Sequence, residues 1–266
     1  MDMIFDTHSH TVFSADSKMR AEDAVRAAGA QGIGLVFTEH LDYDFPGDMR
    51  FEFDPEAYWR AYEGMRGAAL RLGIEVGMQP QTRDRSRAFV ERAPFDAVIG
   101  SQHLLYGSDV YEAKTFAGHT KDEVYLEYLH QMEKNLRLHG DFIDILGHID
   151  YICRYAPYEN PELDDARYAD AIDAVLRAAV ETHTVMELNT RRLGEARAAA
   201  ALLPTYRRYR ELGGRYVTFG SDAHTANAIG AHFDVAARIA AAAGLVSCTF
   251  CERKIIPCAN AGNKIK

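Results

Sequence analysis

Several features that mark other classes of protein are missing from this chain of 266 residues. No window approaches 18 consecutive apolar residues, so we expect no membrane-spanning helix, and the first residues lack the basic and then apolar pattern of a signal peptide. Cysteine is scarce, and Cys248 and Cys251 form one C-x-x-C pair without the second pair that a structural zinc site needs. We therefore expect reduced thiols and a cytoplasmic protein.

Three further signatures are absent. The chain has no glycine-rich phosphate loop, which argues against nucleotide-dependent phosphoryl transfer. Ser101 lacks a G-x-S-x-G context and Cys153 has no base at a suggestive spacing, which argues against a serine or cysteine nucleophile. The net charge of -9 argues against a nucleic-acid partner. An anionic substrate must therefore be met by a local cluster of cations or metals.

Short apolar runs alternate with longer amphipathic stretches along almost the whole chain. The predicted strands are Met3–Phe5, Ile33–Phe37, Ile74–Met78, Ala97–Ile99, Phe142–Leu146, Thr184–Leu188 and Tyr216–Phe219. The predicted helices are Ala21–Ala30, Pro55–Leu72, Arg83–Arg92, Lys121–Leu138, Ala166–Val180, Thr205–Leu212 and Asn227–Ala242. Seven strand-then-helix units without a dinucleotide-binding glycine fingerprint predict an α/β fold with a closed parallel barrel.

We expect a single domain over residues 1–266, because α/β barrels of this length are ordinarily one domain and no linker or repeat interrupts the pattern. The least regular region is Tyr106–Thr120, where Tyr106, Tyr111 and Phe116 are candidates for a lid over a site. Cys248 falls in a final predicted strand. We expect the residues after it, about 255–266, to form a mobile tail.

Six histidines lie where predicted strands end, and three carboxylates accompany them. These nine candidate ligands are His8, His10, His40, His103, His148, His224, Asp16, Glu75 and Asp222. Imidazole and carboxylate suit Zn, Fe or Mn, and nine ligands exceed what one ion needs. Because the carboxyl ends of barrel strands share one rim, we expect these side chains to converge there. The pattern predicts a multinuclear metal hydrolase.

The same motifs resemble the PHP family, named for polymerase and histidinol phosphatase. The resemblance covers nearly the whole chain: H-S-H, F-S-A-D-S, T-E-H, G-I-E, G-S-Q-H, G-H-I-D and G-S-D-A-H occur in that order. Gly147–Tyr155, Glu187–Thr190 and Cys248–Lys254 resemble the histidinol-phosphatase branch in particular. The resemblance implies a distorted seven-stranded (β/α)7 TIM-like barrel. It also implies hydrolysis of L-histidinol phosphate to L-histidinol and inorganic phosphate, a reaction of histidine biosynthesis.

The resemblance further implies two to three divalent ions (Zn, Fe or Mn). One ion would take His8, His10, Glu75 and Asp222, a second would share Glu75 and add His103 and His148, and a third would take Asp16, His40 and His224. We align the bridging ligand to Glu75 and not to Gln79, because a neutral amide cannot supply two anionic oxygens. We expect Glu75, Asp222 and His224 to be catalytic, with a hydroxide that bridges two metals as the nucleophile.

Phosphate favours the planar donor fork of arginine. Arg154, six residues after His148, is the first candidate; Arg191 and Arg192 are the second, and the sequence does not choose between them. The acid that protonates the leaving group is also open between a metal-bound water, His232 and Asp222.

Four acidic residues are candidates for supporting roles. Asp150 follows His148 and Glu39 precedes His40, so both are candidates for hydrogen bonds that orient metal-binding imidazoles. Asp42 and Glu112 are candidates for binding the amine and imidazole of the substrate.

Two alternatives remain open at this stage. One is a PHP-type phosphoesterase that acts on another small phosphorylated metabolite or nucleotide. The other is a non-catalytic metal-binding barrel, against which the intact ligand set argues. The oligomeric state does not follow from the sequence.

Overall fold

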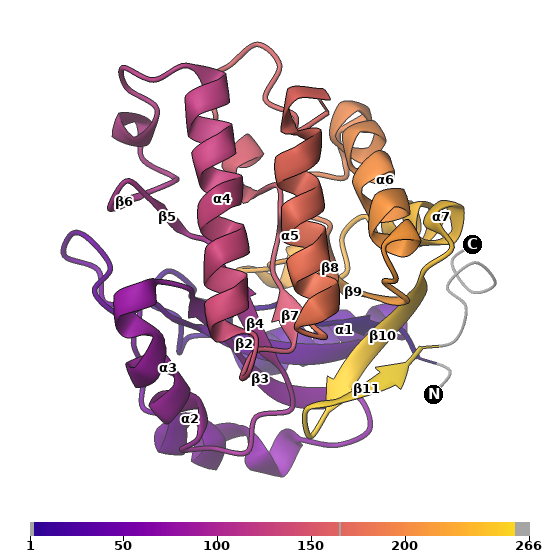
Figure 1. Cartoon of the computed structure of the whole chain (residues 1–266). Helices are drawn as coiled ribbons and strands as arrows, with labels where there is room; N and C mark the ends of the chain where they lie inside the picture. The colour runs from indigo at the N-terminus through magenta and orange to yellow at the C-terminus, as the bar shows by residue number, and fades with distance from the viewer. Residues whose placement is uncertain (1–2, 165, 259–266) are drawn as a thin grey trace.

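Seven parallel strands close into a barrel at the centre of the structure, a computed structural model that describes residues 3–164 and 166–258 (Figure 1). The barrel strands are β1 (Phe5–Asp6), β2 (Gly34–Leu41), β3 (Leu70–Gly77), β4 (Val98–Ser101), β7 (Ile145–Leu146), β8 (Val185–Asn189) and β9 (Tyr216–Gly220). They pair in chain order, and Asp6 of β1 also pairs with Phe219 of β9, which closes the ring. The predicted (β/α)7 TIM-like barrel is confirmed.

Helices follow the strands and cover the outside of the barrel. The α-helices of the described residues are α1 (Ala21–Gln31), α2 (Pro55–Tyr62), α3 (Arg83–Val90), α4 (Lys121–His139), α5 (Ala169–Glu181), α6 (Ala196–Glu211) and α7 (Phe233–Ala243). In Figure 1, α4, α5 and α6 stand next to one another. Asp54 caps α2 by accepting a hydrogen bond from the backbone N–H of Glu56, and Pro55 occupies the first turn. None of the helices described here has the length and apolar character needed to cross a bilayer.

Three predicted helix boundaries are wrong. The helix expected over Pro55–Leu72 ends at Tyr62, because the buried run that starts at Leu70 belongs to β3. The helix expected from Thr205 starts at Ala196, since an alanine-rich segment of high helix propensity adds two turns before it. The last helix starts at Phe233, because residues 226–228 form a separate 3-10 turn.

A hairpin follows the barrel where we expected one strand and a mobile tail. It consists of β10 (Val246–Cys251), which pairs in parallel with β9, and β11 (Lys254–Pro257), which pairs antiparallel with β10. The expectation of a mobile tail is therefore wrong for residues 255–257, which have ladder partners in β10. Cys258 is buried and its backbone N–H donates to the carbonyl of Ser247, while residues 259–266 of that tail lie outside the described residues.

The interior of the barrel changes from apolar to polar along the strands. Near the amino ends, Phe5, Val36, Ile99, Ile145 and Val185 form a buried cluster with Cys248 and Phe250 of the hairpin. Side chains two residues apart on a strand share a face. The residues two positions after Val36, Ile99 and Val185 are Thr38, Ser101 and Glu187, all fully buried. Polar groups are thus concentrated inside the barrel towards the carboxyl ends of the strands.

Two further strands of two residues each complete the fold next to that end of the barrel. They are β5 (Leu104–Leu105) and β6 (Ser108–Asp109), which form an antiparallel hairpin just after β4. Short 3-10 turns follow at Ala113–Thr115 and, after β7, at Tyr151–Arg154. These segments form part of the wall of the pocket described below.

Candidate metal centre

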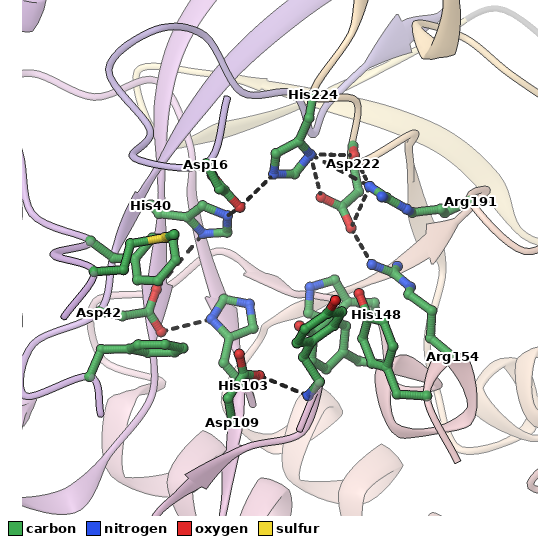
Figure 2. A pocket seen from close by; sticks show the side chains of 16 residues that line it. Asp16, His40, Asp42, His103, Asp109, His148, Arg154, Arg191, Asp222 and His224 are labelled. Atoms are coloured by element: carbon green, nitrogen blue, oxygen red, sulfur yellow. Dashed lines mark hydrogen bonds and ion pairs between the residues drawn. The ribbon is translucent and has the colours of Figure 1, made fainter. Parts of the chain in front are cut away.

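All nine candidate ligands converge at the carboxyl ends of the barrel strands, around a pocket of about 380 Å³ (Figure 2). His40 and Glu75 lie on β2 and β3, and the other ligands lie in the segments that follow β1, β4, β7 and β9. Glu75 and most of the histidines are buried, whereas Asp16 and His224 are partly exposed at the mouth. The convergence expected from the strand order is therefore present.

Glu75 lies at the centre, and its two carboxylate oxygens face two different groups of histidines. Oε2 lies 3.2 Å from Nε2 of His8 and 3.5 Å from Nε2 of His10. Oε1 lies 3.1 Å from Nε2 of His103 and 3.0 Å from Nε2 of His148. Burial raises the pKa of Glu75, but the surrounding histidines hold it well below its ordinary value. An anionic Glu75 is thus positioned to serve two cations at once.

Asp222 completes the first group. Its Oδ1 lies 3.4 Å from Nε2 of His10 and 3.9 Å from Nε2 of His8. Burial opposes ionisation, but Arg154 and the nearby histidines hold the pKa of Asp222 well below its ordinary value. Its backbone has a φ of 53°, in the left-handed region that aspartate adopts more readily than most residues. This turn directs the Asp222 carboxylate back over the barrel.

A third group lies at the mouth of the pocket. Oδ2 of Asp16 lies 3.1 Å from Nε2 of His224 and 3.6 Å from Nε2 of His40. The ring of His10 stacks on both imidazoles, with centroids 4.1 Å from His40 and 4.3 Å from His224. His40 also presents Nδ1 to Glu75 Oε2 at 2.9 Å, so it lies between the central and the outer groups.

The polar atoms at the centre lack the hydrogen bonds that burial normally requires. Among the described residues, Nε2 of His8, Nε2 of His10, Nδ1 of His40 and Oε2 of Glu75 are buried, and although they lie close to one another, none has a hydrogen bond of acceptable geometry. Buried polar groups are otherwise nearly always satisfied. Ligand atoms of His8, His10 and Glu75 lie within 4.8 Å of one another, as do those of Glu75, His103 and His148. These residues fit divalent cations bound between them.

Hydrogen bonds to carboxylates fix which ring nitrogen of His8 and of His103 faces the centre. Nδ1 of His8 donates to Oε1 of Glu187 at 2.7 Å, and Nδ1 of His103 donates to Oδ1 of Asp42 at 2.7 Å. Since a carboxylate can only accept, Nδ1 carries the proton in both rings and Nε2 is left as the free electron-pair donor. Glu187 also accepts from the backbone N–H of His148 at 2.8 Å. It therefore links the two groups of histidines.

His10 is oriented by a hydroxyl group. Ser14 Oγ donates to Oε2 of Glu39 at 2.7 Å and lies 3.0 Å from Nδ1 of His10, from which it accepts. The backbone N–H of His40 also donates to Ser14 Oγ, at 3.1 Å. We expected Glu39 to orient the ring of His40; instead it accepts from Thr11 and from Ser14, and so acts on His10. The adjacent position in the sequence was misleading because neighbouring strand residues face opposite ways.

Glu187 and Ser14 were not among the candidates from the sequence, and Asp42 was expected to have a different role. Glu187 lies on an inward-facing position of β8, two residues after the apolar Val185, and this period of two was the available signal. Asp42 lines the pocket but its carboxylate is engaged by His103, so it is not free for a substrate group. Gln79, the alternative to Glu75, donates to the backbone carbonyl of Tyr43.

Two of the three candidate arginines line the pocket. Nη1 of Arg154 donates to Oδ2 of Asp222 at 2.6 Å, and its Nη2 donates to Oδ1 of Asn189 at 3.2 Å. Nη1 of Arg191 donates to the backbone carbonyl of Asp222 at 2.8 Å. Figure 2 shows both side chains entering on the same side of the opening. Both can present N–H groups to an anion above Asp222.

Arg192, proposed alongside Arg191, does not reach the pocket. Its guanidinium is buried and donates to Asp150 at 2.9 Å and to Glu162 at 2.5 Å. Arg191 and Arg192 lie in a turn after β8, and the buried carboxylates of Asp150 and Glu162 hold the Arg192 side chain away from the pocket. Asp150 is consequently the partner of Arg192 and not, as expected, of the His148 ring. The expectation that Arg192 binds phosphate is wrong.

Four other candidates lie apart from the described lining of the pocket: His232, Glu112, Tyr106 and Phe116. His232 is exposed at the start of α7, and Glu112 is paired with Lys114 at 2.5 Å. Of the three lid candidates, Tyr111 lines the pocket, whereas Tyr106 stacks on a histidine of its own loop and Phe116 is buried in the core. The loop therefore contributes one wall, with a single tyrosine at the opening.

Comparison with known proteins gives matches to the same family over most of the chain. Residues 6–191 match the sequence profile described as the PHP domain. A probable histidinol-phosphatase of Clostridium acetobutylicum is 42% identical over 238 residues, which cover 90% of this chain and 93% of that protein. A histidinol-phosphatase of Lactococcus lactis subsp. lactis is 30% identical over 231 residues, which cover 83% of this chain and 84% of that protein.

A solved structure shares the fold. The crystal structure of a histidinol phosphate phosphatase from Lactococcus lactis subsp. lactis, complexed with zinc, L-histidinol and phosphate, matches with a TM-score of 0.86 at 26% sequence identity. The match covers 95% of this chain and 98% of that chain. The similarity thus includes the barrel and the segments that surround the pocket.

Proposed function

The chain belongs to the PHP domain family, and from that membership we propose that it is a metal-dependent phosphomonoesterase that hydrolyses L-histidinol phosphate to L-histidinol and inorganic phosphate. The observation that carries the proposal is the cluster of imidazoles and carboxylates next to two pocket arginines. The identity to histidinol-phosphatases over most of the chain supports the substrate. The reaction belongs to histidine biosynthesis, and four free cysteines accord with a reducing cytoplasm.

We propose that the centre holds two to three divalent ions, with zinc as the first candidate because the Lactococcus structure contains it. His8, His10, Asp222 and one oxygen of Glu75 would hold the first ion. The other Glu75 oxygen would bind a second ion together with His103 and His148, and the third would be bound by Asp16, His40 and His224. Such ions, when bound, activate water and neutralise charge on phosphoryl oxygens.

The protein's own groups position the ester. Arg154 and Arg191 meet the phosphate oxygens from one side of the pocket, because Asp222 and Asn189 hold their guanidinium groups at the opening. Arginine provides a planar fork of donors that stays charged at any physiological pH. Glu75 and Asp222 remain ionised despite burial, so they supply negative charge to the ions without first losing a proton.

The decisive experiment is phosphate release from L-histidinol phosphate by protein purified without chelator, compared with a panel of sugar phosphates and nucleotides. We expect kcat/KM for histidinol phosphate to exceed the panel by several orders of magnitude. Similar slow rates on every ester would support a phosphatase of another substrate and contradict the assignment to the histidine pathway.

Metal content is measured on the same preparation. Elemental analysis should find two to three ions per chain, and chelation should abolish turnover until Zn²⁺, Mn²⁺ or Fe²⁺ is restored. A chelated protein that remains fully active would contradict the metal-dependent mechanism.

A further inference from the structure

A buried arginine outside the pocket connects two segments that carry pocket residues. Arg192 donates from Nη1 to Oδ2 of Asp150 at 2.9 Å and from Nη2 to Oε1 of Glu162 at 2.5 Å. All three side chains are buried, and within the described residues neither carboxylate forms an ion pair with any other side chain. Because a buried carboxylate that loses its cation is strongly destabilising, these contacts resist separation.

Each end of this cluster leads directly to an arginine of the pocket. Asp150 immediately precedes the 3-10 turn Tyr151–Arg154, whose last residue is the pocket arginine Arg154. Arg192 immediately follows the other pocket arginine, Arg191, in the turn after β8. The ion pair between Arg192 and Asp150 therefore fixes the distance between the two turns from below the pocket.

Asn189 joins the same two turns at the pocket itself. Its Oδ1 accepts from Nη2 of Arg154 at 3.2 Å and from the backbone N–H of Arg191 at 3.1 Å. The side chain of Arg191 is 44% exposed, and its guanidinium donates to the backbone carbonyl of Asp222. The direction of this exposed side chain thus depends on how its backbone is held. With Asn189 and Arg192 as two points of attachment, one turn cannot rotate about the other.

We propose that Arg192 is a positioning residue for the phosphate group, an inference that rests on the proposed function. Its ion pairs hold the turns at the separation at which Arg154 and Arg191 meet oxygens of one phosphate, and errors of about 1 Å in such placements are costly. The backbone of the metal-ligand candidate His148 is held separately, by Glu187. Loosening Arg192 should therefore weaken phosphate binding and leave metal binding intact.

The test uses two variants, Arg192→Lys and Glu162→Gln, neither of which leaves both buried carboxylates without a cation. A lysine ammonium keeps the charge but cannot reproduce the planar fork that contacts Asp150 and Glu162 together. Glutamine keeps an oxygen acceptor for Arg192 and leaves the contact with Asp150 in place. The dissociation constant of inorganic phosphate is measured by calorimetry on the zinc-loaded proteins, and their zinc content by elemental analysis.

We expect the phosphate dissociation constant of Arg192→Lys to rise about 10- to 100-fold, the range of one charge-assisted hydrogen bond. KM for histidinol phosphate should rise with it, and zinc content should equal that of wild type. Glu162→Gln should show a smaller rise in both constants, because Arg192 and Asp150 remain paired.

Arg66→Lys is the matched control for a weakened buried ion pair. Arg66 donates from Nε and Nη2 to the buried Asp96 at 2.9 and 2.7 Å, and neither residue is among those described as lining the pocket. This variant should be less stable to denaturant than wild type and should bind phosphate equally well.

Unchanged phosphate binding in both Arg192→Lys and Glu162→Gln, with a loss of stability like that of Arg66→Lys, would overturn the positioning role. A parallel loss of zinc would also overturn it, because the effect would then act through the metal centre. Failure of the wild-type protein to hydrolyse histidinol phosphate would instead contradict the proposed function, and the calorimetric comparison would still decide the role of Arg192.

Discussion

Each of three buried histidines in the centre has its Nδ1 proton bound by a different oxygen, from Glu187, Asp42 or Ser14. These contacts leave Nε2 of His8, His103 and His10 as the atoms that face Glu75 and Asp222. The rings are therefore oriented before any ion arrives, and less conformational entropy is lost when a metal binds. Glu187 contacts two of the histidines, since it also accepts a hydrogen bond from the backbone N–H of His148.

We predict that Glu187→Gln weakens zinc affinity about 10- to 100-fold, the usual effect of changing a group that orients a metal-binding histidine. The amide retains one oxygen for the His148 N–H but loses the charge that His8 Nδ1 faces. Competition with a chromophoric chelator measures the affinity. Glu181→Gln is the control, because Glu181 is an exposed residue paired with Arg137 at the end of α5. Equal affinity in the two variants would exclude the orienting role.

Arg154 gives a second prediction. Arg154→Lys keeps the positive charge but cannot contact Asp222 and Asn189 with two N–H groups while it faces phosphate. We expect kcat/KM to fall about 10²- to 10³-fold, as for loss of one donor to a developing anion. Steady-state kinetics provide the measurement, with Arg238→Lys, an exposed arginine of α7, as the control. A variant as active as wild type would remove Arg154 from phosphate binding.

Most of the nine candidate ligands could be identified from the sequence because they closely follow an apolar run of strand length, whereas Glu75 lies within one. The residues around them could not be assigned in the same way. Arg191 and Arg192 are adjacent in the chain, yet one faces the pocket and the other is buried on Asp150 and Glu162. Such a difference depends on tertiary contacts that no local pattern encodes.

At the level of elements, all seven barrel strands were predicted in the right order, although β2 ends four residues later and β3 begins four residues earlier than expected. Strand positions follow from buried apolar runs. Helix α6, in contrast, begins two turns before its amphipathic pattern, because the alanines there favour helix formation but do not alternate between apolar and polar faces. The short β11 was missed because its residues are only partly buried, and it forms by pairing with β10. Pairing of this kind depends on a partner, not on the segment alone.

Gly220, the last residue of β9, provides a prediction about strand packing. A Cβ at this position would lie 2.0 Å from Oε1 of Glu187 and 2.6 Å from Cβ of His8. We expect Gly220→Ala to lower the free energy of unfolding by about 1–3 kcal/mol and to reduce zinc affinity, because both side chains must move. Denaturant titration and chelator competition measure the two effects.

The control for Gly220→Ala is Gly29→Ala in helix α1, where an added Cβ meets no atom within 4 Å. This change should raise the free energy of unfolding by up to about 1 kcal/mol, since alanine loses less backbone entropy in a helix. If both variants behaved alike, the close contact at Gly220 would have no energetic importance.

At the scale of the whole molecule, Asp96 connects segments that are far apart in the chain. Its buried carboxylate accepts hydrogen bonds from Nε and Nη2 of Arg66 at 2.9 and 2.7 Å, from the backbone N–H of Leu72 at 3.0 Å and from that of Glu252 at 2.9 Å. It thus ties the segment after α2, the strand β3 and the β10–β11 turn together at the end of the barrel opposite the metal centre.

We predict that Asp96→Asn lowers the free energy of unfolding by about 2–3 kcal/mol at pH 7, because it removes charge-assisted hydrogen bonds. Burial raises the pKa of Asp96, but Arg66 and two backbone N–H groups bring it below the ordinary 3.8. The stabilisation is therefore present above pH 3.8 and is lost as the pH falls through the lower folded-state pKa. Denaturant titration at several pH values should show the difference from wild type shrinking at acid pH.

Asp84→Asn is the matched control, since Asp84 is an exposed carboxylate paired with Arg83 at 2.6 Å. An exposed pair contributes little, so we expect a change below about 0.5 kcal/mol at any pH. A gap between wild type and Asp96→Asn that stayed constant down to acid pH would mean that ionisation of Asp96 is not the cause.

The two oxygens of Glu75 face separate sets of histidines, and this has a consequence for inheritance. A mutation in one histidine codon leaves the other set intact, so a lineage can drift through a weakened intermediate and recover by reversion or compensation. A mutation in the codon for Glu75 disables both sets in one generation. Descendants of this gene that keep the activity should therefore vary at individual histidines before they vary at position 75.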